Sequence, residues 1–149
     1  MKAYLQLQQW WEATGAGITT ETIPEPLIAE LENHYSLSLP DDFRDYLRLS
    51  SPVAETLDEH FCTWWDFKRI KNIPDECPPE RAPAIPGQAH KYLFFADYCI
   101  WCWAWAISCA DDETRGSVAL IGGPGYDKIV ASSFSEFVQK YISDWKSVT

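Results

Sequence analysis

The hydrophobic positions are most regular near the C-terminus, where they recur with the spacing of one face of an α-helix. Ser133 precedes this stretch and Glu136 follows three residues later, which is the pattern of an N-terminal capping box. The apolar positions are Phe134, Phe137, Val138, Tyr141, Ile142 and Trp145. This spacing predicts an amphipathic helix that begins near Ser133 and packs its apolar face on the rest of the protein.

Three further helices are predicted in the first part of the chain. The first covers residues 3–12, with loosely spaced apolar positions, and ends before two nearby glycines. Glu25 and Pro26 open the second, because proline is favoured in a first turn, where its missing N–H costs nothing. The third follows Pro40, begins with two aspartates that favour the positive end of the helix dipole, and ends at Ser50–Pro52.

The second half of the chain changes to the alternating pattern of β-strands. Four strands are predicted there, and they cover residues 92–96, 99–108, 117–121 and 126–131. The connections are short, and the later ones are rich in aspartate or glycine. Consecutive strands are therefore expected to be antiparallel neighbours in a meander.

Large and small side chains alternate along residues 99–108. The large residues are tryptophans at 101, 103 and 105, and the small ones are Cys102, Ala104 and Ala106. On a strand, these two sets occupy opposite faces. We expect a helix to pack closely against the small face.

Helices, then a meander, then a final helix predict an α+β fold with helices packed on a largely antiparallel sheet. The chain has 149 residues, 46% of them hydrophobic, which suits one domain spanning residues 1–149. Between residues 53 and 86 the pattern is weaker. We expect a short strand or helix around residues 61–70, then a loop rich in proline.

The most apolar stretch, residues 92–110, is about long enough to cross a bilayer but contains Asp97 and three central tryptophans. Its alternation favours a strand, so no membrane span is expected.

The N-terminus lacks the basic and apolar regions of a cleaved secretion signal. Five irregularly spaced cysteines do not suggest a disulfide framework. Reduced thiols and a cytoplasmic location are the expectation.

The chain is strongly acidic, with 12 basic and 22 acidic side chains and a formal net charge of -10. This charge repels phosphate backbones and anionic lipid surfaces, so nucleic acids and membranes are not expected partners. It would attract a basic protein and raise the rate of association. Solubility is the alternative explanation of the same composition.

No catalytic or metal-binding motif is complete in this sequence. Cys99 and Cys102 have C-x-x-C spacing, but on a strand they would point to opposite faces, so buried structural thiols are expected. His60 and Cys62 could share a strand face, without any metal-binding motif around them. Residues 122–125, GGPG, lack the lysine of a phosphate loop and are expected to form a hairpin turn. We expect no enzyme activity, no cofactor and no bound metal.

Residues 39–50, LPDDFRDYLRLS, carry an LP pair, an aspartate and spaced aromatic residues ahead of a leucine. This segment resembles the LP-x-D-[YF]-x-x-[FY]-L signature of the SUKH superfamily, which includes fungal cell-wall synthesis regulators and bacterial toxin-immunity proteins. Segments similar to its first helix, its F-A-D strand and its closing helix follow the same order, at residues 28–32, 92–97 and 129–138. The resemblance covers about residues 23–143. Two turns depart from it, at Ser50–Pro52 and Tyr98–Cys99, where the family often has Asn-Gly and glycine.

The resemblance implies an α+β binding domain without a catalytic centre, whose partner differs between members. For a small free-standing member, it implies an immunity protein that binds and neutralises a cognate bacterial toxin. Such toxins are frequently basic nucleases or nucleotide-modifying enzymes, and the acidic charge fits that class. The alternative is a non-catalytic intracellular adaptor or regulator that binds signalling proteins. We expect a monomer or a weak dimer.

The residues that contact this partner are predicted from an aromatic pair in an acidic segment. Trp64 and Trp65 are adjacent on an expected strand, so they cannot face the same core and one is expected to be exposed. Between Arg48 and Lys68 the chain has four acids and no basic residue. An exposed aromatic ringed by carboxylates has the composition of a hot spot for a basic partner. The predicted partner-binding residues are Trp64, Glu55, Asp58, Glu59, Asp66, Asp111, Asp112 and Glu113.

Overall fold

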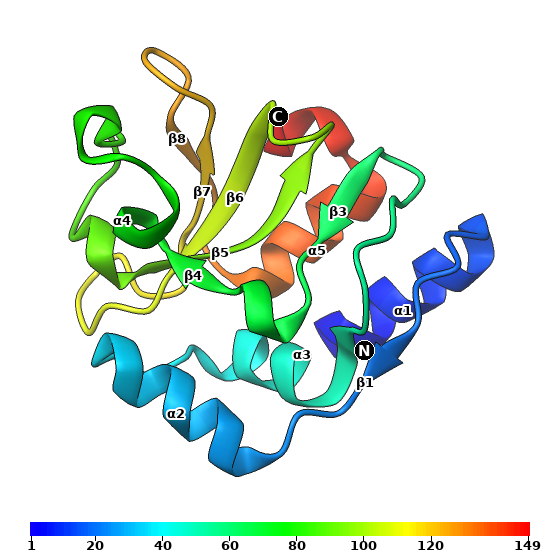
Figure 1. The fold of residues 1–149 in the computed structure, drawn as a ribbon. Coiled ribbons are helices and arrows are strands. Elements are labelled where there is room, and N and C mark those ends of the chain that lie inside the picture. Colours follow the sequence, from blue (N-terminus) through cyan, green and yellow to red (C-terminus); the bar gives the residue numbers. More distant parts are fainter.

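The computed structural model describes residues 1–149, and its helices lie where the sequence predicts them, with one addition (Figure 1). The helices are α1 (Ala3–Thr14), α2 (Glu25–Tyr35), α3 (Asp41–Ser50), α4 (Ile73–Glu76) and α5 (Phe134–Ser143). Short stretches of 3-10 helix occur at Phe67–Arg69, Pro79–Arg81, Ala89–Lys91 and Trp145–Val148. The addition is α4, a single turn within the segment where the pattern is weak. None of the helices combines the length and apolar character needed to span a bilayer.

Six strands form the main sheet, which is antiparallel throughout. Its order is β3-β5-β6-β7-β8, and β4 pairs with β5. The strands are β3 (Cys62–Trp64), β4 (Lys71–Asn72), β5 (Tyr92–Tyr98), β6 (Trp103–Ser108), β7 (Val118–Ile121) and β8 (Lys128–Ala131). A separate ribbon pairs β1 (Thr20–Glu21) with β2 (Ser51–Pro52). The predicted α+β fold, with its meander from β5 to β8, is confirmed.

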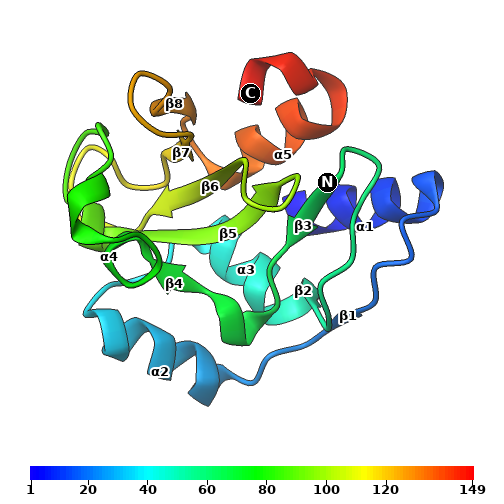
Figure 2. The ribbon, with the colours of Figure 1, turned by 45° about the horizontal axis from the view of Figure 1, so that its top comes forward.

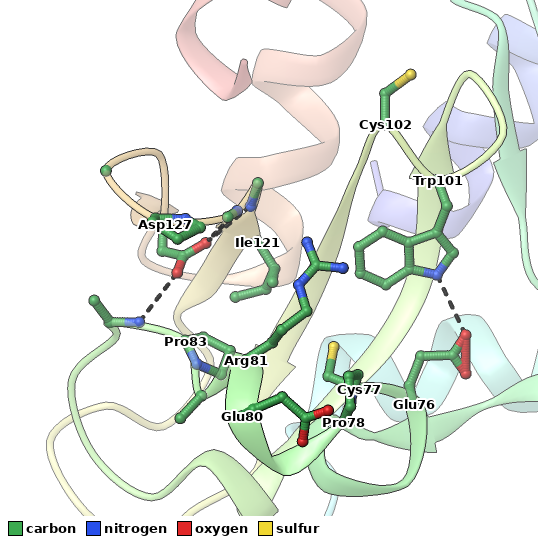
Figure 3. A pocket seen from close by; sticks show the side chains of 16 residues that line it. Glu76, Cys77, Pro78, Glu80, Arg81, Pro83, Trp101, Cys102, Ile121 and Asp127 are labelled. Carbon is green, nitrogen blue, oxygen red and sulfur yellow. Dashed lines mark hydrogen bonds between the residues drawn. The ribbon is translucent and has the colours of Figure 1, made fainter.

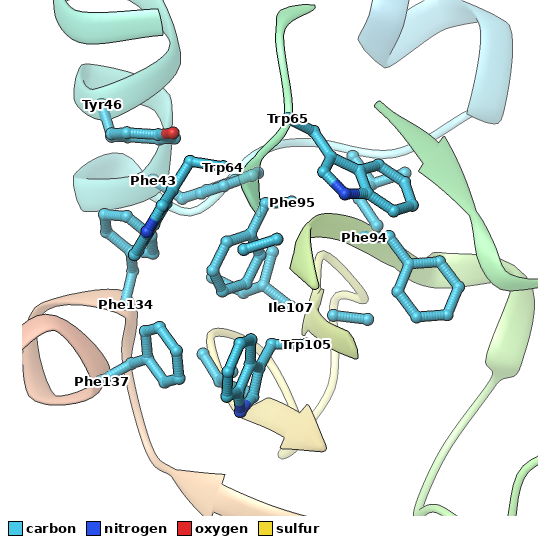
Figure 4. Close-up of a cluster of buried hydrophobic side chains, with 14 of the residues drawn as sticks. Phe43, Tyr46, Trp64, Trp65, Phe94, Phe95, Trp105, Ile107, Phe134 and Phe137 are labelled. Carbon is cyan, nitrogen blue, oxygen red and sulfur yellow. The ribbon is translucent and has the colours of Figure 1, made fainter. Parts of the chain in front are cut away.

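Aromatic side chains from α3, α5 and the sheet meet in the core (Figure 4). The ring centroid of Phe43 lies 5.6 Å from that of Phe95 and 5.3 Å from that of Phe134. Phe137 lies 5.3 Å from Phe95. The face predicted for the last helix is buried at Phe134, Phe137, Val138 and Tyr141, whereas Ile142 is half-buried and Trp145 lies beyond α5 in the final 3-10 stretch. The residues that α3 buries are Phe43, Tyr46, Leu47 and Ser50.

The two faces of β6 are packed differently from the expectation. Trp105 faces α5, with its ring centroid 5.5 Å from that of Phe137. Ala106 pairs with Phe94 on the opposite face, where Phe94 contacts the ring of Trp101. The expectation of helix packing against the small face, and of one face for all three tryptophans, is therefore wrong. Rings from the neighbouring strand and the turn fill the space beside the small residues instead.

The LP segment joins helices and turns that are distant in the sequence. Asp42 Oδ2 accepts hydrogen bonds of 2.8 Å from both the backbone N–H and the hydroxyl of Ser135, at the start of α5. The backbone N–H of Leu39 donates to Glu32 at 2.9 Å, and its carbonyl accepts from Arg115 at 3.1 Å. These residues therefore maintain the fold, which explains how the signature can accompany different partners.

The cap of α5 forms only half of the predicted capping box. Ser133 Oγ accepts a hydrogen bond of 3.0 Å from the backbone N–H of Glu136, as expected. The Glu136 carboxylate does not return to the Ser133 backbone; it pairs with Lys140 at 2.7 Å and accepts from the Ser132 hydroxyl. The side-chain cap alone satisfies one of the free N–H groups at this helix end.

Candidate protein-binding site

Trp64 and Trp65 are both buried, with exposed fractions of 0%, so the expectation that one of them is exposed is wrong. Trp64 faces the helices, 5.2 Å from the ring of Tyr141. Trp65 lies on the other face of the sheet, beside Phe94, with the Arg69 guanidinium 4.0 Å above its ring. The two side chains do face opposite ways, but both faces are covered at this point. Neither ring is available to a partner in this conformation.

Asp58 is the second predicted contact residue that is buried, with an exposed fraction of 6%. Its Oδ2 accepts hydrogen bonds from Trp64 Nε1 at 3.0 Å and from the Tyr141 hydroxyl at 2.5 Å. Its Oδ1 accepts from the backbone N–H groups of His60 and Cys62, at 2.9 and 3.1 Å. Four donors balance the cost of burying this carboxylate. Asp58 therefore holds the chain before β3 against α5.

The remaining acids of this segment differ in their exposure and in whether they form an ion pair. Glu59 is exposed and Asp66 is half-buried. Glu55 is exposed and forms an ion pair of 2.7 Å with Arg69. Because an exposed pair of this kind is worth little, a basic partner could compete for Glu55 at small cost. Glu55 and Glu59 therefore remain the accessible acids of the predicted site.

The turn at residues 111–113 does not join the other predicted residues. It connects β6 to β7, whereas β3 begins at the opposite end of the antiparallel sheet, beside the β5–β6 turn. The Asp112 carboxylate accepts from the backbone N–H and hydroxyl of Thr114, and these hydrogen bonds lower the pKa of Asp112. Asp111 and Glu113 are exposed. The structure thus divides the predicted acids between two ends of the sheet.

Phe61 and Ile100 are bulky apolar residues that the analysis of the sequence missed. Their φ angles are 61° and 56°, in the left-handed region, and their exposed fractions are 63% and 93%. That region costs an L-residue roughly 1–2 kcal/mol, and a β-branched side chain such as that of Ile100 is especially unusual there. The backbone N–H of Cys99 donates to the carbonyl of Phe61 at 3.0 Å, so both residues lie at one end of the sheet.

Half-buried aromatic rings lie at the same end of the sheet as this pair. Tyr98 and Trp103 pair across β5 and β6 and stack with their centroids 4.2 Å apart and their planes 13° apart. His60 stacks on Trp145 with centroids 4.2 Å apart. Figure 2 shows the start of β3 and the β5–β6 turn at the same end of the molecule. We define the sheet-end surface as His60, Phe61, Tyr98, Ile100 and Trp103.

A cleft of about 650 Å³ lies beside the β5–β6 turn (Figure 3). Its walls come from residues 76–84, from Trp101 and Cys102, and from the β7–β8 turn. Trp101 Nε1 donates to Glu76 at 3.2 Å. Asp127 accepts from three backbone N–H groups, which fixes two of the walls together; the donors are Gly122, Gly123 and Ala84. The volume is within the range of ligand sites, and the turn is the hairpin predicted at residues 122–125.

The lining of this cleft is more acidic than basic. Its ionisable side chains include Glu76, Glu80, Asp127 and Arg81. The cleft and the sheet-end surface both adjoin the β5–β6 turn, because Trp101 lines the cleft and its neighbour Ile100 projects into solvent. At this end of the molecule, the exposed side chain of Ile100 therefore lies next to the acidic cleft.

Cys99 and Cys102 do not lie on a strand. They lie in the turn at residues 99–102, where residues 99–101 all have positive φ, and both are exposed, so the expectation of buried thiols is wrong for this pair. Cys62 and Cys109 are buried, and desolvation raises the pKa of the Cys109 thiol to about 12. All five cysteines are unpaired, and no three metal-binding side chains are grouped so that they could hold an ion.

The comparisons with known proteins identify the family. Residues 22–140 match the family model described as SMI1 / KNR4 family (SUKH-1). The matched range contains the main sheet, the cleft and the sheet-end surface. No curated protein matches the chain significantly. The match confirms the resemblance carried by residues 39–50 and the later segments: this chain is a member of the SMI1 / KNR4 family (SUKH-1).

Proposed function

We propose that this chain is an immunity protein, which binds a cognate protein toxin and neutralises it without catalysis. The observation that carries the proposal is the membership of a SUKH family, which is consistent with toxin immunity. Members of one fold family bind different partners, so the kind of partner is inferred from the surface of this chain.

The sheet-end surface and its acidic surroundings have the composition of a protein-binding site. Exposed aromatic and aliphatic side chains supply the desolvated centre that carries most of the binding free energy in protein interfaces. Glu55 and Glu59 lie in the segment before β3, and the net charge of the whole chain is -10. A basic toxin, such as a nuclease, would be attracted to this surface at long range.

Neutralisation by this route is occlusion: the immunity protein covers the catalytic or substrate-binding surface of the toxin. A nuclease surface that holds a phosphate backbone is basic, so an acidic protein can compete for the same surface. The complex then needs slow dissociation more than any chemical step. No catalytic group is required of the immunity protein.

The proposal is tested by co-expressing the chain with the product of the adjacent gene and measuring growth of the host. The neighbour alone should arrest growth, and the pair should restore it. The purified pair should also bind at low ionic strength, where electrostatic attraction is strongest. If the neighbour is not toxic, or if the purified proteins do not bind, the immunity function is wrong, and the adaptor function takes its place.

A further inference from the structure

The backbone at the sheet-end surface presents Phe61 and Ile100 in a conformation that their residue types do not favour. Glycine, asparagine and aspartate adopt the left-handed region more readily than phenylalanine or isoleucine. Neither side chain gains much burial within the chain in return, because both are largely exposed. The stability of the isolated domain therefore does not explain why these residue types stand here.

The surrounding hydrogen bonds maintain this conformation. On one side, the backbone N–H of Phe61 donates to the carbonyl of Asp58 at 3.0 Å, and Asp58 is itself fixed by its buried carboxylate. On the other side, Cys102 donates to the carbonyl of Tyr98 at 2.8 Å and closes the turn around Ile100. Backbone strain that is held in this way is concentrated at functional sites.

Lysine and arginine are absent from the two segments that carry Phe61 and Ile100, and the nearby cations from other segments, Arg69 and Lys128, pair with Glu55 and with the Thr149 carbonyl. Residues 49–67, which lead into β3, contain no lysine or arginine, and neither do residues 92–114, which include the β5–β6 turn. Of the eight acids in these segments, residues 111–113 lie at the other end of the sheet and Asp58 and Asp97 are buried, whereas Glu59 is exposed and is two positions from Phe61. A basic protein is therefore the complementary partner for this surface.

We propose that Phe61 and Ile100 are the two apolar anchors by which this chain holds a basic protein partner. The partner would accept them in an apolar pocket edged by lysine or arginine side chains. The hydrogen-bonded left-handed backbone fixes the positions from which both side chains project before binding, which lowers the ordering cost of the complex. The proposal rests on the proposed function, because the basic partner is the toxin of that proposal.

The test compares dissociation rates of the complex with the toxic product of the adjacent gene. Phe61→Ser and Ile100→Ser should each raise the dissociation rate by about tenfold or more, with little change in the association rate. The matched control is Leu27→Ser, because Leu27 is an exposed aliphatic residue on α2, with an exposed fraction of 40%. This control should change the dissociation rate by less than about twofold.

A second measurement needs no partner. Ile100→Asn should leave the melting temperature unchanged or raise it, because asparagine adopts the left-handed region more easily and Ile100 buries little surface. A large fall in melting temperature would show that Ile100 supports the fold, which would overturn its role as a presented anchor.

Sedimentation of the wild-type chain tests whether the surface binds a second copy. A dimer that Phe61→Ser dissociates would assign this surface to a second copy and overturn the proposal.

Two outcomes distinguish a failure of the proposed anchors from a failure of the proposed immunity function. If the wild-type pair binds and rescues growth, but the two serine variants dissociate no faster than Leu27→Ser, then the anchors are wrong and the function stands. If the wild-type pair does not bind, the function is wrong and the anchors fail with it.

Discussion

Asp58 and Tyr141 lie 83 positions apart in the sequence and are joined by a hydrogen bond of 2.5 Å from the Tyr141 hydroxyl to the Asp58 carboxylate. This bond fastens the segment that carries Phe61 to the C-terminal helix. It also shows why an acid in a charged segment need not belong to the surface. The role expected for Asp58, as an acid at the edge of a binding site, requires an exposure that the structure does not give it.

Asp58→Ala should destabilise the protein by about 3 kcal/mol or more, because it leaves several buried donors without an acceptor. The free energy of unfolding can be measured by urea denaturation. Glu59→Ala is the matched control, since Glu59 is the adjacent exposed acid, and it should change stability by less than about 0.5 kcal/mol. Equal effects of the two substitutions would mean that Asp58 is not a buried hydrogen-bond acceptor.

Phe137→Ala should cost roughly 3–5 kcal/mol, because it removes a fully buried ring from the centre of the aromatic core. Gln139→Ala, on the exposed face of the same helix, controls for the change in helix propensity. Thermal melting distinguishes the two variants. A Phe137→Ala protein that melts within a degree or two of the wild type would contradict the packing of α5 on the sheet.

The five thiols should fall into distinct classes in the native protein. Cys99 and Cys102 are exposed and should react with a thiol reagent in the native protein, whereas Cys62 and Cys109 should react only after unfolding. Burial also raises the pKa of the Cys62 and Cys109 thiols, so both stay protonated and unreactive at pH 8 in the native protein. Titration in denaturant should recover all five groups, whose number is fixed by the sequence. A stable disulfide, or rapid reaction of Cys109, would contradict this assignment.

The elements with a strong local signal could be predicted from the sequence. The spacing from Phe134 to Tyr141 and the Ser133 cap identified α5, and the proline and aspartates before Phe43 identified α3. The short turns predicted the antiparallel meander, which the strand order confirms. In each case the pattern is complete within one element, so no tertiary information is needed.

The candidate site could be predicted only in part, because its features depend on contacts between distant segments. Burial of Trp65 follows from Phe94 and Arg69 lying over it, and burial of Asp58 follows from Tyr141. The exposure of Ile100 arises from a left-handed turn that contains no glycine, so the usual sign of such a turn is missing. One hint was present: antiparallel pairing requires a turn between β5 and β6, so residues 99–102 cannot all continue a strand.

The most direct test of the central claim is the association rate of the chain with the toxic product of the adjacent gene, measured for two double variants. Glu55→Lys with Glu59→Lys reverses the two accessible acids of the segment that leads to Phe61 and β3, and Asp111→Lys with Glu113→Lys makes the same change in net charge at the opposite end of the sheet. The account predicts that the first lowers the association rate by about tenfold at low salt and reduces its salt dependence, while the second changes it by less than about twofold. Equal rates for the two variants, or binding that neither affects, would contradict recognition of a basic toxin through the sheet-end surface.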